Sequence, residues 1–401
     1  YPCFIINLNM KNIIYFLSLI ITFSSFSQEK ITDSIQGTKQ NLDEVIVESV
    51  RVKYSSPITH SNILKSELSS KNLGQDLPVL LNFLPSVVTT SDAGAGIGYT
   101  GIRIRGVSAQ STNITINGIP FNDPESHGTY WVNLPDFTSS VESLQVQRGV
   151  GTSTNGSGAF GASINILTDA ISNNPYAEIS NSVGSYNTSK HTVKFSTGKL
   201  SDSFEFSGRL SKIDSDGYVD RAYSDLKSYF IQGAYIKGNT LIKALTFGGH
   251  EKTYQSWFGV TKEQLLENRR QNPYTYENEI DNYKQDHYQF HWNQKLNQKW
   301  STNLGLNYTY GRGYFEQFRD DDSIETYGGI VVSDIDQQGN KTGTTDLIRR
   351  RWLDNNFYVL NASANYKTSK LNLTFNSSFS TYSGDHYGEV VWARNFNKNS
   401  S

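Results

Sequence analysis

Residues 142–168 read Glu-Ser-Leu-Gln-Val-Gln-Arg-Gly-Val-Gly-Thr-Ser-Thr-Asn-Gly-Ser-Gly-Ala-Phe-Gly-Ala-Ser-Ile-Asn-Ile-Leu-Thr. Apolar and polar residues alternate at 143–147 and again at 163–168, which indicates two strands. The segment between them is dense in glycine, as sharp turns are. The stretch therefore predicts a strand, a glycine-rich turn and a second strand.

The residues around this stretch predict a small α+β domain over residues 55–170. Further strands are predicted at 57–63, 101–105 and 113–116, and helices at 65–70, 73–84 and 135–141. The helix at 73–84 carries leucines at helical spacing, and Pro85 ends it. The domain thus combines a sheet with short helices.

Residues 175–401 have a different pattern, with period-two alternation and no predicted helix. Phe204, Phe206 and Leu210 share one face of a strand, whereas Glu205 and Arg209 share the other. About nine such strands follow one another, with the length of a tilted membrane-spanning strand. Because a plugged barrel of the transporter type has ~22 strands, we interpret the chain as an N-terminal fragment with an incomplete antiparallel transmembrane β-barrel.

The connections between these strands differ in length in a regular way. Tight turns are predicted at 237–239, 296–298 and 368–370, and long polar loops at 255–283 and 314–353. Short turns on one side and long loops on the other are typical of outer-membrane barrels.

Four segments resemble, in the required order, signatures of the TonB-dependent outer-membrane receptors. Residues 42–47 (Leu-Asp-Glu-Val-Ile-Val) resemble the TonB box, and residues 80–87 (Leu-Leu-Asn-Phe-Leu-Pro-Ser-Val) resemble the LPGV helix end. Residues 102–106 with 116–120 resemble the IRG and DGVP strand pair, and 142–168 resembles the end of the plug domain. Departures from the family pattern leave the ligand class open and occur at Ser86, Asn117, Val150 and Ala162.

The resemblance implies a plug domain at 55–170 and a barrel from 175 onward, in the outer membrane of a Gram-negative bacterium. It implies TonB-dependent active transport of a scarce nutrient, with a ferric siderophore or similar metal chelate as the first hypothesis. Cobalamin, haem or oligosaccharide uptake, and a non-transporting adhesion or signalling barrel, are the alternatives. The implied partners are TonB, outer-membrane lipid and lipopolysaccharide, and the chelate as cargo, without a cofactor or resident metal.

The resemblance also assigns roles to individual residues. The segment that would add a strand to TonB through main-chain hydrogen bonds consists of Asp43, Glu44, Val45, Ile46 and Val47. The plug apices that would meet ligand contain Asp92, Tyr99, Asn122, Asp123, Glu125, His127, Tyr130 and Trp131. Arg105 and Arg148 would pair with carboxylates of the barrel wall; the alternative is that both reach water in a wet lumen.

The N-terminal residues predict export. Met10 is the expected start, Lys11 gives a positive charge, and residues 13–23 are apolar before small residues at 24–27. This order predicts a signal peptide over 10–27, and the apolar run is shorter than the ~20 residues of a spanning helix. Residues 28–54 then form a periplasmic tether that carries the TonB box. The single cysteine, Cys3, precedes Met10, so no disulfide is expected.

Other patterns in the sequence favour no further kind of site. The net charge of −2 provides no basic field for nucleic acid. Two G-x-G-x-x-G matches, at 96–101 and 156–161, precede strands, whereas a dinucleotide site needs a helix there. His287 and His291 would lie ~13 Å apart on a strand, too far for one metal. Residues 320–322 (Asp-Asp-Asp) fit a solvated loop tip better than a Ca²⁺ site. No nucleophile elbow is visible, so no enzyme is predicted.

Overall fold

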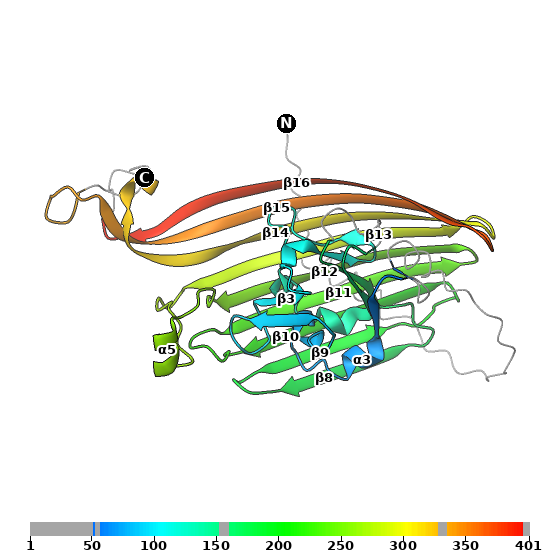
Figure 1. Cartoon of the computed structure of the whole chain (residues 1–401), viewed down its shortest axis with the longest axis horizontal. Helices are drawn as coiled ribbons and strands as arrows, with labels where there is room; N and C mark the ends of the chain where they lie inside the picture. Colours follow the sequence, from blue (N-terminus) through cyan, green and yellow to red (C-terminus); the bar gives the residue numbers. More distant parts are fainter. Residues whose placement is uncertain (1–50, 53–56, 152–159, 328–334, 396–401) are drawn as a thin grey trace, which may run out of the picture. The chain divides into compact units, whose positions relative to one another are not determined.

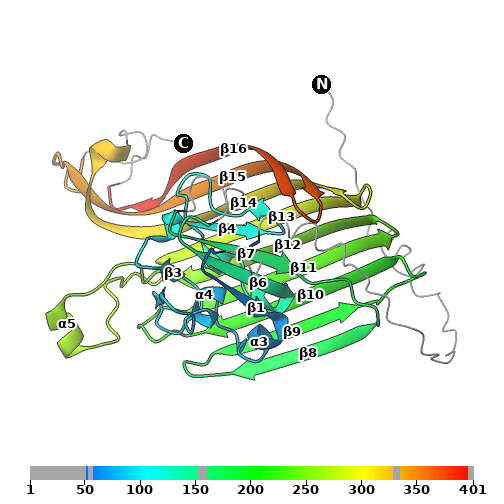
Figure 2. The same cartoon turned by 45° about the vertical axis from the view of Figure 1, so that its right-hand side comes forward.

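The structure is a computed structural model that describes residues 51–52, 57–151, 160–327 and 335–395. All of them belong to one compact unit of the chain. They form a small α+β domain and a curved sheet of nine antiparallel strands, on one face of which the domain lies (Figure 1, Figure 2). The predicted signal peptide (10–27) and TonB box (42–47) lie outside the described residues.

The α+β domain is built on a five-stranded sheet with the order β1-β6-β7-β4-β5. Its β4 and β7 run parallel and the other neighbours run antiparallel, while β2 and β3 form a separate pair. The strands are β1 (His60–Leu64), β2 (Val87–Ser91), β3 (Thr100–Ile104), β4 (Thr112–Ile116), β5 (Ile119–Pro120), β6 (Val141–Arg148) and β7 (Ala162–Thr168). The helical elements are α3 (Lys65–Ser69), α4 (Leu77–Leu80) and the 3-10 turns η1 (Ala109–Ser111), η2 (Trp131–Asn133) and η3 (Phe137–Ser140).

Alternating apolar residues of the segment 142–168 form the core of this domain. Leu144 and Val146 of β6 and Ile164 of β7 are fully buried, because every second residue of a strand points to the same face. The same apolar cluster continues into the nine-stranded sheet through Phe230, Leu245 and Phe247. The two parts therefore share one core, in which burying each large apolar side chain contributes about 1.5–3 kcal/mol.

The helix predicted at 73–84 is much shorter in the structure. Only Leu77–Leu80 is helical, with Asp76 at the N-cap in an extended conformation. Gly74 has φ +122°, which no helix allows, so the helix cannot include Gly74. At the other end, a residue before proline avoids the helical region, so Pro85 ends the helix early.

The nine strands of the large sheet pair in sequence order, each antiparallel to the next. They are β8 (Tyr176–Val183), β9 (Ser189–Ser196), β10 (Phe204–Ser215), β11 (Ser224–Lys237), β12 (Thr240–Tyr254), β13 (Ile280–Lys295), β14 (Trp300–Ser323), β15 (Thr344–Lys367) and β16 (Asn372–Ala393). In the described part of the chain β8 and β16 are the edges and do not pair with each other. The expected tight turns at 237–239, 296–298 and 368–370 join consecutive strands.

The faces of this sheet are inverted relative to a water-soluble sheet. In β10, Glu205 and Arg209 are buried, and Arg209 donates to Ser140 of the α+β domain. Phe204, Phe206 and Leu210 point outward and are exposed. A polar inner face and an apolar outer face are what a barrel in lipid requires. Among the described residues, no helix is both long and apolar enough to cross a membrane.

Two predictions about the loops were wrong. The loop at 255–283 contains a helix, α5 (Lys262–Glu267), which begins with a capping box between Thr261 and Gln264. In the loop predicted at 314–353, residues 314–323 belong to β14 and residues 344–353 to β15, each of which runs for 24 residues. Those strands are longer than a bilayer requires, so their outer ends can be polar on both faces. A segment that is polar on both faces resembles a loop in the sequence. The Asp320–322 run lies at this outer end, where the strand register shifts between Arg319 and Asp322.

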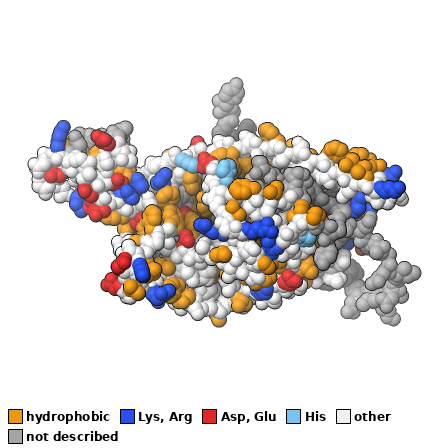
Figure 3. Space-filling view, viewed as in Figure 1, with side chains coloured by type: hydrophobic (Ala, Val, Ile, Leu, Met, Phe, Trp, Pro, Cys, Tyr) orange, Lys and Arg blue, Asp and Glu red, His pale blue; other side chains and the backbone are white. Residues whose placement is uncertain are grey.

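The long connections lie together at one end of the sheet. In both ribbon views, α5 and the outer ends of β14 and β15 project at the left, and the tight turns lie at the right (Figure 1, Figure 2). Charged side chains gather on these two projections in the space-filling view (Figure 3). The connections at the two ends of the sheet thus differ in length.

Candidate functional site

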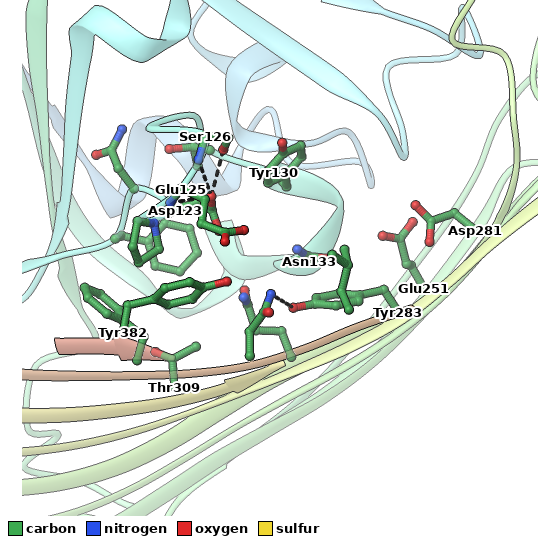
Figure 4. Close-up of a pocket in the computed structure, with 18 of the residues that line it drawn as sticks. Asp123, Glu125, Ser126, Tyr130, Asn133, Glu251, Asp281, Tyr283, Thr309 and Tyr382 are labelled. Atoms are coloured by element: carbon green, nitrogen blue, oxygen red, sulfur yellow. Dashed lines mark hydrogen bonds between the residues drawn. The ribbon is translucent and has the colours of Figure 1, made fainter. Parts of the chain in front are cut away.

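A cavity of about 590 Å³ lies between the α+β domain and the inner face of the sheet (Figure 4). One side is formed by the β2–β3 loop and by the segment that follows β5. The other side is formed by inward-facing residues of β12 to β16 and by Trp257 in the loop before α5. The cavity lies toward the end of the sheet from which the long loops project, since β12 contributes Glu251 and β13 contributes Asp281.

The segment after β5 is held in a tight loop by one carboxylate. Asp123 Oδ1 accepts hydrogen bonds from the backbone N–H of Glu125 at 3.1 Å and of Ser126 at 2.7 Å. It also accepts from the Ser126 hydroxyl at 2.8 Å. An Asp that binds its own backbone in this way mimics a turn, so this wall of the cavity is preorganised.

The residues predicted at the plug apices divide into two groups. Those that line the cavity are Asp92, Tyr99, Asn122, Asp123, Glu125 and Tyr130. Trp131 does not line it: its side chain is 3% exposed and belongs to the hydrophobic core. His127 does not line it either. It has φ +58°, and its carbonyl accepts a hydrogen bond from the Asn122 amide at 2.9 Å, so it closes the loop through its backbone.

The sheet side of the cavity was not predicted from the sequence. Tyr99 of the α+β domain donates a short hydrogen bond to Asp281 of β13. The ring of Tyr99 also meets the edge of Trp257 at 5.3 Å between centroids. Further inward-facing residues that line the cavity are Glu251, Tyr283, Gln289, Arg351, Tyr382 and His386. Alternation along each strand indicates that these residues face inward, but not which of them meet the α+β domain.

Burial shifts the pKa values of the acids that the α+β domain brings to this region. It raises the pKa of Asp92, which lines the cavity, to about 6. It raises the pKa of the neighbouring Asp76 to about 8, although the Thr100 hydroxyl donates to its carboxylate at 2.9 Å. Burial and the nearby carboxylates raise the pKa of the Tyr99 phenol well above its usual value, so this group remains a hydrogen-bond donor.

The α+β domain is seated on the sheet by a buried ionic cluster around Asp136. Its carboxylate lies 2.8 Å from Lys190 Nζ of β9 and 3.3 Å from Arg209 Nη1 of β10. The hydroxyls of Thr192 and Ser211 donate to it at 2.7 and 2.8 Å. Burial alone would raise the pKa of Asp136, but the two cations outweigh this effect and hold it below its usual range. Asp136 is therefore ionised and paired at neutral pH.

A second ionic contact reinforces the first. Asp169, which follows β7, lies 2.5 Å from Lys194 of β9 and 2.6 Å from Lys65 of α3. Lys194 also donates to the carbonyl of Ser139 at 2.7 Å. In both clusters the α+β domain supplies the carboxylate and the sheet supplies a cation.

The two arginines singled out in the sequence lie at the ends of β3 and β6. Arg148 is buried and donates to the Pro85 carbonyl at 3.1 Å and to the Ser61 hydroxyl at 2.8 Å. Burial and the nearby charge of Arg105 lower its pKa. Within the described ranges neither arginine makes an ion pair with a carboxylate, so the predicted pairing with the barrel wall stays a prediction.

The two histidines of β13 each hydrogen-bond a neighbouring side chain. His287 shares a hydrogen bond with the Thr309 hydroxyl at 2.8 Å, and His291 with the Gln289 amide oxygen at 3.2 Å. In the part of the chain that the structure describes, no three His, Cys, Asp or Glu side chains are grouped closely enough to hold a metal ion.

An α+β domain seated against the polar inner face of an antiparallel sheet with an apolar outer face defines a plugged transmembrane β-barrel. The model of the TonB-dependent receptor plug domain matches residues 52–163, which contain β1 to β6 and the start of β7. The chain is therefore similar to TonB-dependent receptors in its plug domain and in its fold. From here on, the α+β domain is called the plug and the nine-stranded sheet the barrel wall.

Known proteins are similar over parts of their length. A probable TonB-dependent siderophore receptor of Acinetobacter baumannii, PirA, is 23% identical over 235 residues, which cover 55% of this chain and 29% of the relative. The ferric-catecholate import receptor Fiu of Escherichia coli K12 has a similar fold, with a TM-score of 0.62 at 13% identity over 83% of this chain and 50% of that one. BauA, the ferric preacinetobactin receptor of A. baumannii, gives 0.62 at 11% identity over 83% and 48%. The chain thus spans about half the length of these solved receptors and less of the curated relative.

Proposed function

We propose that this protein carries a ferric siderophore or a similar metal chelate across the outer membrane of a Gram-negative bacterium, driven by TonB. The observation that carries the proposal is the cavity between the plug apices and the wall, where a ligand would touch both parts at once. A ligand that contacts both parts can change the contacts between plug and wall when it binds. The plug is the part that must move for cargo to pass. The names of the relatives, which describe receptors for siderophores or their iron complexes, support this class of cargo.

The lining suits a small organic chelate in size and chemistry. Ligand cavities of 300–1,000 Å³ are usual for small molecules, and this one falls within that range. Aromatic rings, including those of Tyr99, Tyr130 and Trp257, provide flat apolar surface, and side-chain amides and carboxylates provide polar contacts. Such a mixed surface binds an organic shell around a metal rather than the bare ion.

Energy for transport would enter at residues 42–47. The outer membrane has no nucleotide pool of its own, and a β-prone segment ahead of the plug can add a strand to a partner through main-chain hydrogen bonds. The chain joins the plug to the wall at residues 169–175, and the other contacts between the two, such as the ionic pairs of Asp136 and Asp169, are non-covalent. A pull from the periplasmic side would therefore displace the plug without breaking a covalent bond.

The experiment is uptake of ⁵⁵Fe-labelled chelates by cells with and without the gene, in the presence and absence of TonB. We expect gene-dependent and TonB-dependent accumulation of at least one chelate, with energy-independent surface binding retained when TonB is absent. Identical accumulation in the deletion strain across hydroxamate, catecholate and mixed chelates would contradict the proposal. Parallel growth assays on haem, cobalamin and oligosaccharides would then identify an alternative cargo.

A further inference from the structure

Acidic side chains outnumber basic ones on the cavity wall. Five carboxyl groups line it, from Asp92, Asp123, Glu125, Glu251 and Asp281. The basic lining residues are Arg351, His287 and His386, and the ring of His386 lies 3.1 Å from the Glu125 carboxyl group. The Arg351 guanidinium lies over the ring of Phe315 at 5.4 Å, and the side chain is exposed. An anionic ligand would therefore find few basic partners on this wall.

Two of these carboxylates form a buried pair on neighbouring strands. Glu251 of β12 is 1% exposed and Asp281 of β13 is 8% exposed, and their carboxyl groups lie next to one another in the cavity (Figure 4). The Thr253 hydroxyl donates to Glu251 at 3.1 Å, and the Tyr99 phenol donates to Asp281. Neither carboxylate has an ion-pair partner among the described residues. Adjacent buried carboxylates without a cation are unfavourable, so a cation supplied from the cavity would be stabilised there.

Other lining groups also favour a hydrogen-bond donor. Asn133 lines the cavity and is only 7% exposed. Its Oδ1 has no hydrogen-bond partner within the described residues. Asn307 lines it as well, and its Oδ1 likewise has no described partner. Beside the carboxylate pair, the rings of Tyr99 and Trp257 provide π-faces that attract cations. Carboxylates, amide oxygens and aromatic rings all favour a positively charged group that carries N–H donors.

We propose that the cavity selects a metal chelate that bears a protonated amine, and that Glu251 and Asp281 together bind this ammonium group. The inference rests on the proposed function and specifies its substrate class. Because two carboxylates are too few to hold a bare metal ion, which needs four or more protein or water ligands, the cation belongs to the organic shell. The metal itself is carried by the chelator.

The test compares two iron chelates that differ in one group. The probes are the ⁵⁵Fe complex of a linear trihydroxamate with one free terminal amine and the same complex after N-acetylation. An anionic ⁵⁵Fe tris-catecholate is the third probe. Binding is measured on chilled, de-energised cells that express the complete receptor, so that transport does not contribute. We expect the amine-bearing chelate to bind about tenfold or more tightly than its acetylated form.

The double variant Glu251→Gln, Asp281→Asn preserves shape and removes both charges. It should bring the ratio of the affinities for the amine-bearing and acetylated chelates close to one. Protease resistance of the plug, which should match that of the native receptor, reports correct folding of the variant. The matched control is Asp354→Asn, whose neighbours Leu353 and Asn355 line the cavity, so that strand alternation directs Asp354 away from it.

The outcomes separate the two proposals. Equal binding of the amine-bearing and acetylated chelates, or tighter binding of the tris-catecholate, overturns the charge preference and leaves chelate binding intact. Loss of preference in Asp354→Asn but not in the double variant also overturns it. Failure of all three chelates to bind, together with failure of uptake for every iron chelate tested, overturns the proposed function and this inference with it.

Discussion

Asp136 of the plug and Lys190 of the barrel wall form an ion pair of 2.8 Å in which both side chains are almost completely buried. Asp136 has φ +51°, and the turn that it forms carries its carboxylate toward β9 and β10. The family resemblance predicts that arginines of the plug meet carboxylates of the wall, and this pairing stays a prediction. In the buried ion pairs on the described part of the wall, the plug provides the acid and the wall provides the base.

Removing this carboxylate should loosen the plug. In Asp136→Asn, Lys190 and Arg209 lose their shared counter-charge while remaining buried, and breaking a buried pair in this way costs about 3–5 kcal/mol. The measurement is calorimetric unfolding of the plug in the detergent-solubilised receptor, with limited proteolysis as a second readout. The control is Asp214→Asn, which breaks a 2.6 Å contact with Lys212 in an exposed pair worth about 0–1 kcal/mol. Equal losses in both variants would refute the special role of the buried cluster.

Asp76 should make plug stability depend on pH in the opposite sense to an ordinary paired carboxylate. Burial raises its pKa to about 8, against ~3.9 for an unfolded Asp. Between these values the native state binds a proton that the unfolded state does not, so the free energy of unfolding falls as pH rises and levels off above about 8. Asp76→Asn has no proton to lose and can still accept from Thr100.

The measurement is the free energy of unfolding of the plug at pH 5 and at pH 8.5. We expect the native protein to be less stable at the higher pH and Asp76→Asn to show a smaller difference between the two. A native protein with the same pH slope as Asp76→Asn would show that this carboxyl does not hold its proton in the folded state.

Local pattern explains what the sequence could predict. The alternation of Leu144 and Val146 in β6, and of Glu205 and Arg209 in β10, predicted strands of both sheets and separated the two faces of the wall. Hydrophobic periodicity depends on neighbours in the chain, so one strand is enough to reveal it. The plug apex residues that line the cavity, such as Asp123 and Tyr99, were identified through the family motifs.

Contacts between distant residues explain what could not be predicted. Tyr99 and Asp281 are 182 positions apart, and Asp136 and Arg209 meet only because the plug sits inside the wall. Trp131 fits a ligand-binding aromatic by composition, but its place in the 3-10 turn η2 directs it into the core. Strand length was also misjudged, since β14 and β15 continue beyond the membrane, where the apolar alternation that marks a membrane strand no longer applies.

Close approach of plug and wall at Gly249 gives a steric prediction. A Cβ on Gly249 of β12 would lie 2.4 Å from the carbonyl oxygen of Asn133 and 2.6 Å from Pro135 Cδ. Gly249→Ala should therefore displace the plug segment and cost about 1–3 kcal/mol, as overpacking does. Gly233→Ala on β11 is the matched control, because nothing lies within 4 Å of its Cβ position. Protease sensitivity of the plug is the readout, and an unchanged digestion pattern in Gly249→Ala would disprove tight seating at this point.

Energy coupling can be tested at residues 42–47 without altering the cavity. Ile46→Pro removes a backbone donor and fixes φ, so the segment can no longer add a strand to TonB. We expect uptake of the labelled chelate to be abolished while binding to chilled cells is unchanged. Ile46→Val keeps the backbone donor and serves as the control. Normal uptake by Ile46→Pro would mean that this segment is not where TonB acts.

The orientation of the barrel wall follows from the difference between its two ends. The helix α5 and the outer ends of β14 and β15 project from one end, and tight turns such as 237–239 close the other (Figure 1). In outer-membrane barrels the long connections face the outside and the short ones face the periplasm. Leu266 of α5 is 81% exposed and Asn239 lies in an exposed turn, so both are suitable labelling positions.

Cysteine labelling tests this orientation with little background, because Cys3 is the single cysteine in the sequence and precedes the predicted mature start. An impermeant maleimide added to intact cells should label Leu266→Cys fully and Asn239→Cys only after the outer membrane is opened. Uptake of the labelled chelate by both variants, measured before modification, controls for folding. Labelling of Asn239→Cys on intact cells together with protection of Leu266→Cys would reverse the orientation. It would also place the acidic cavity, which lies toward the α5 end, on the periplasmic side, where it could not capture cargo from the medium.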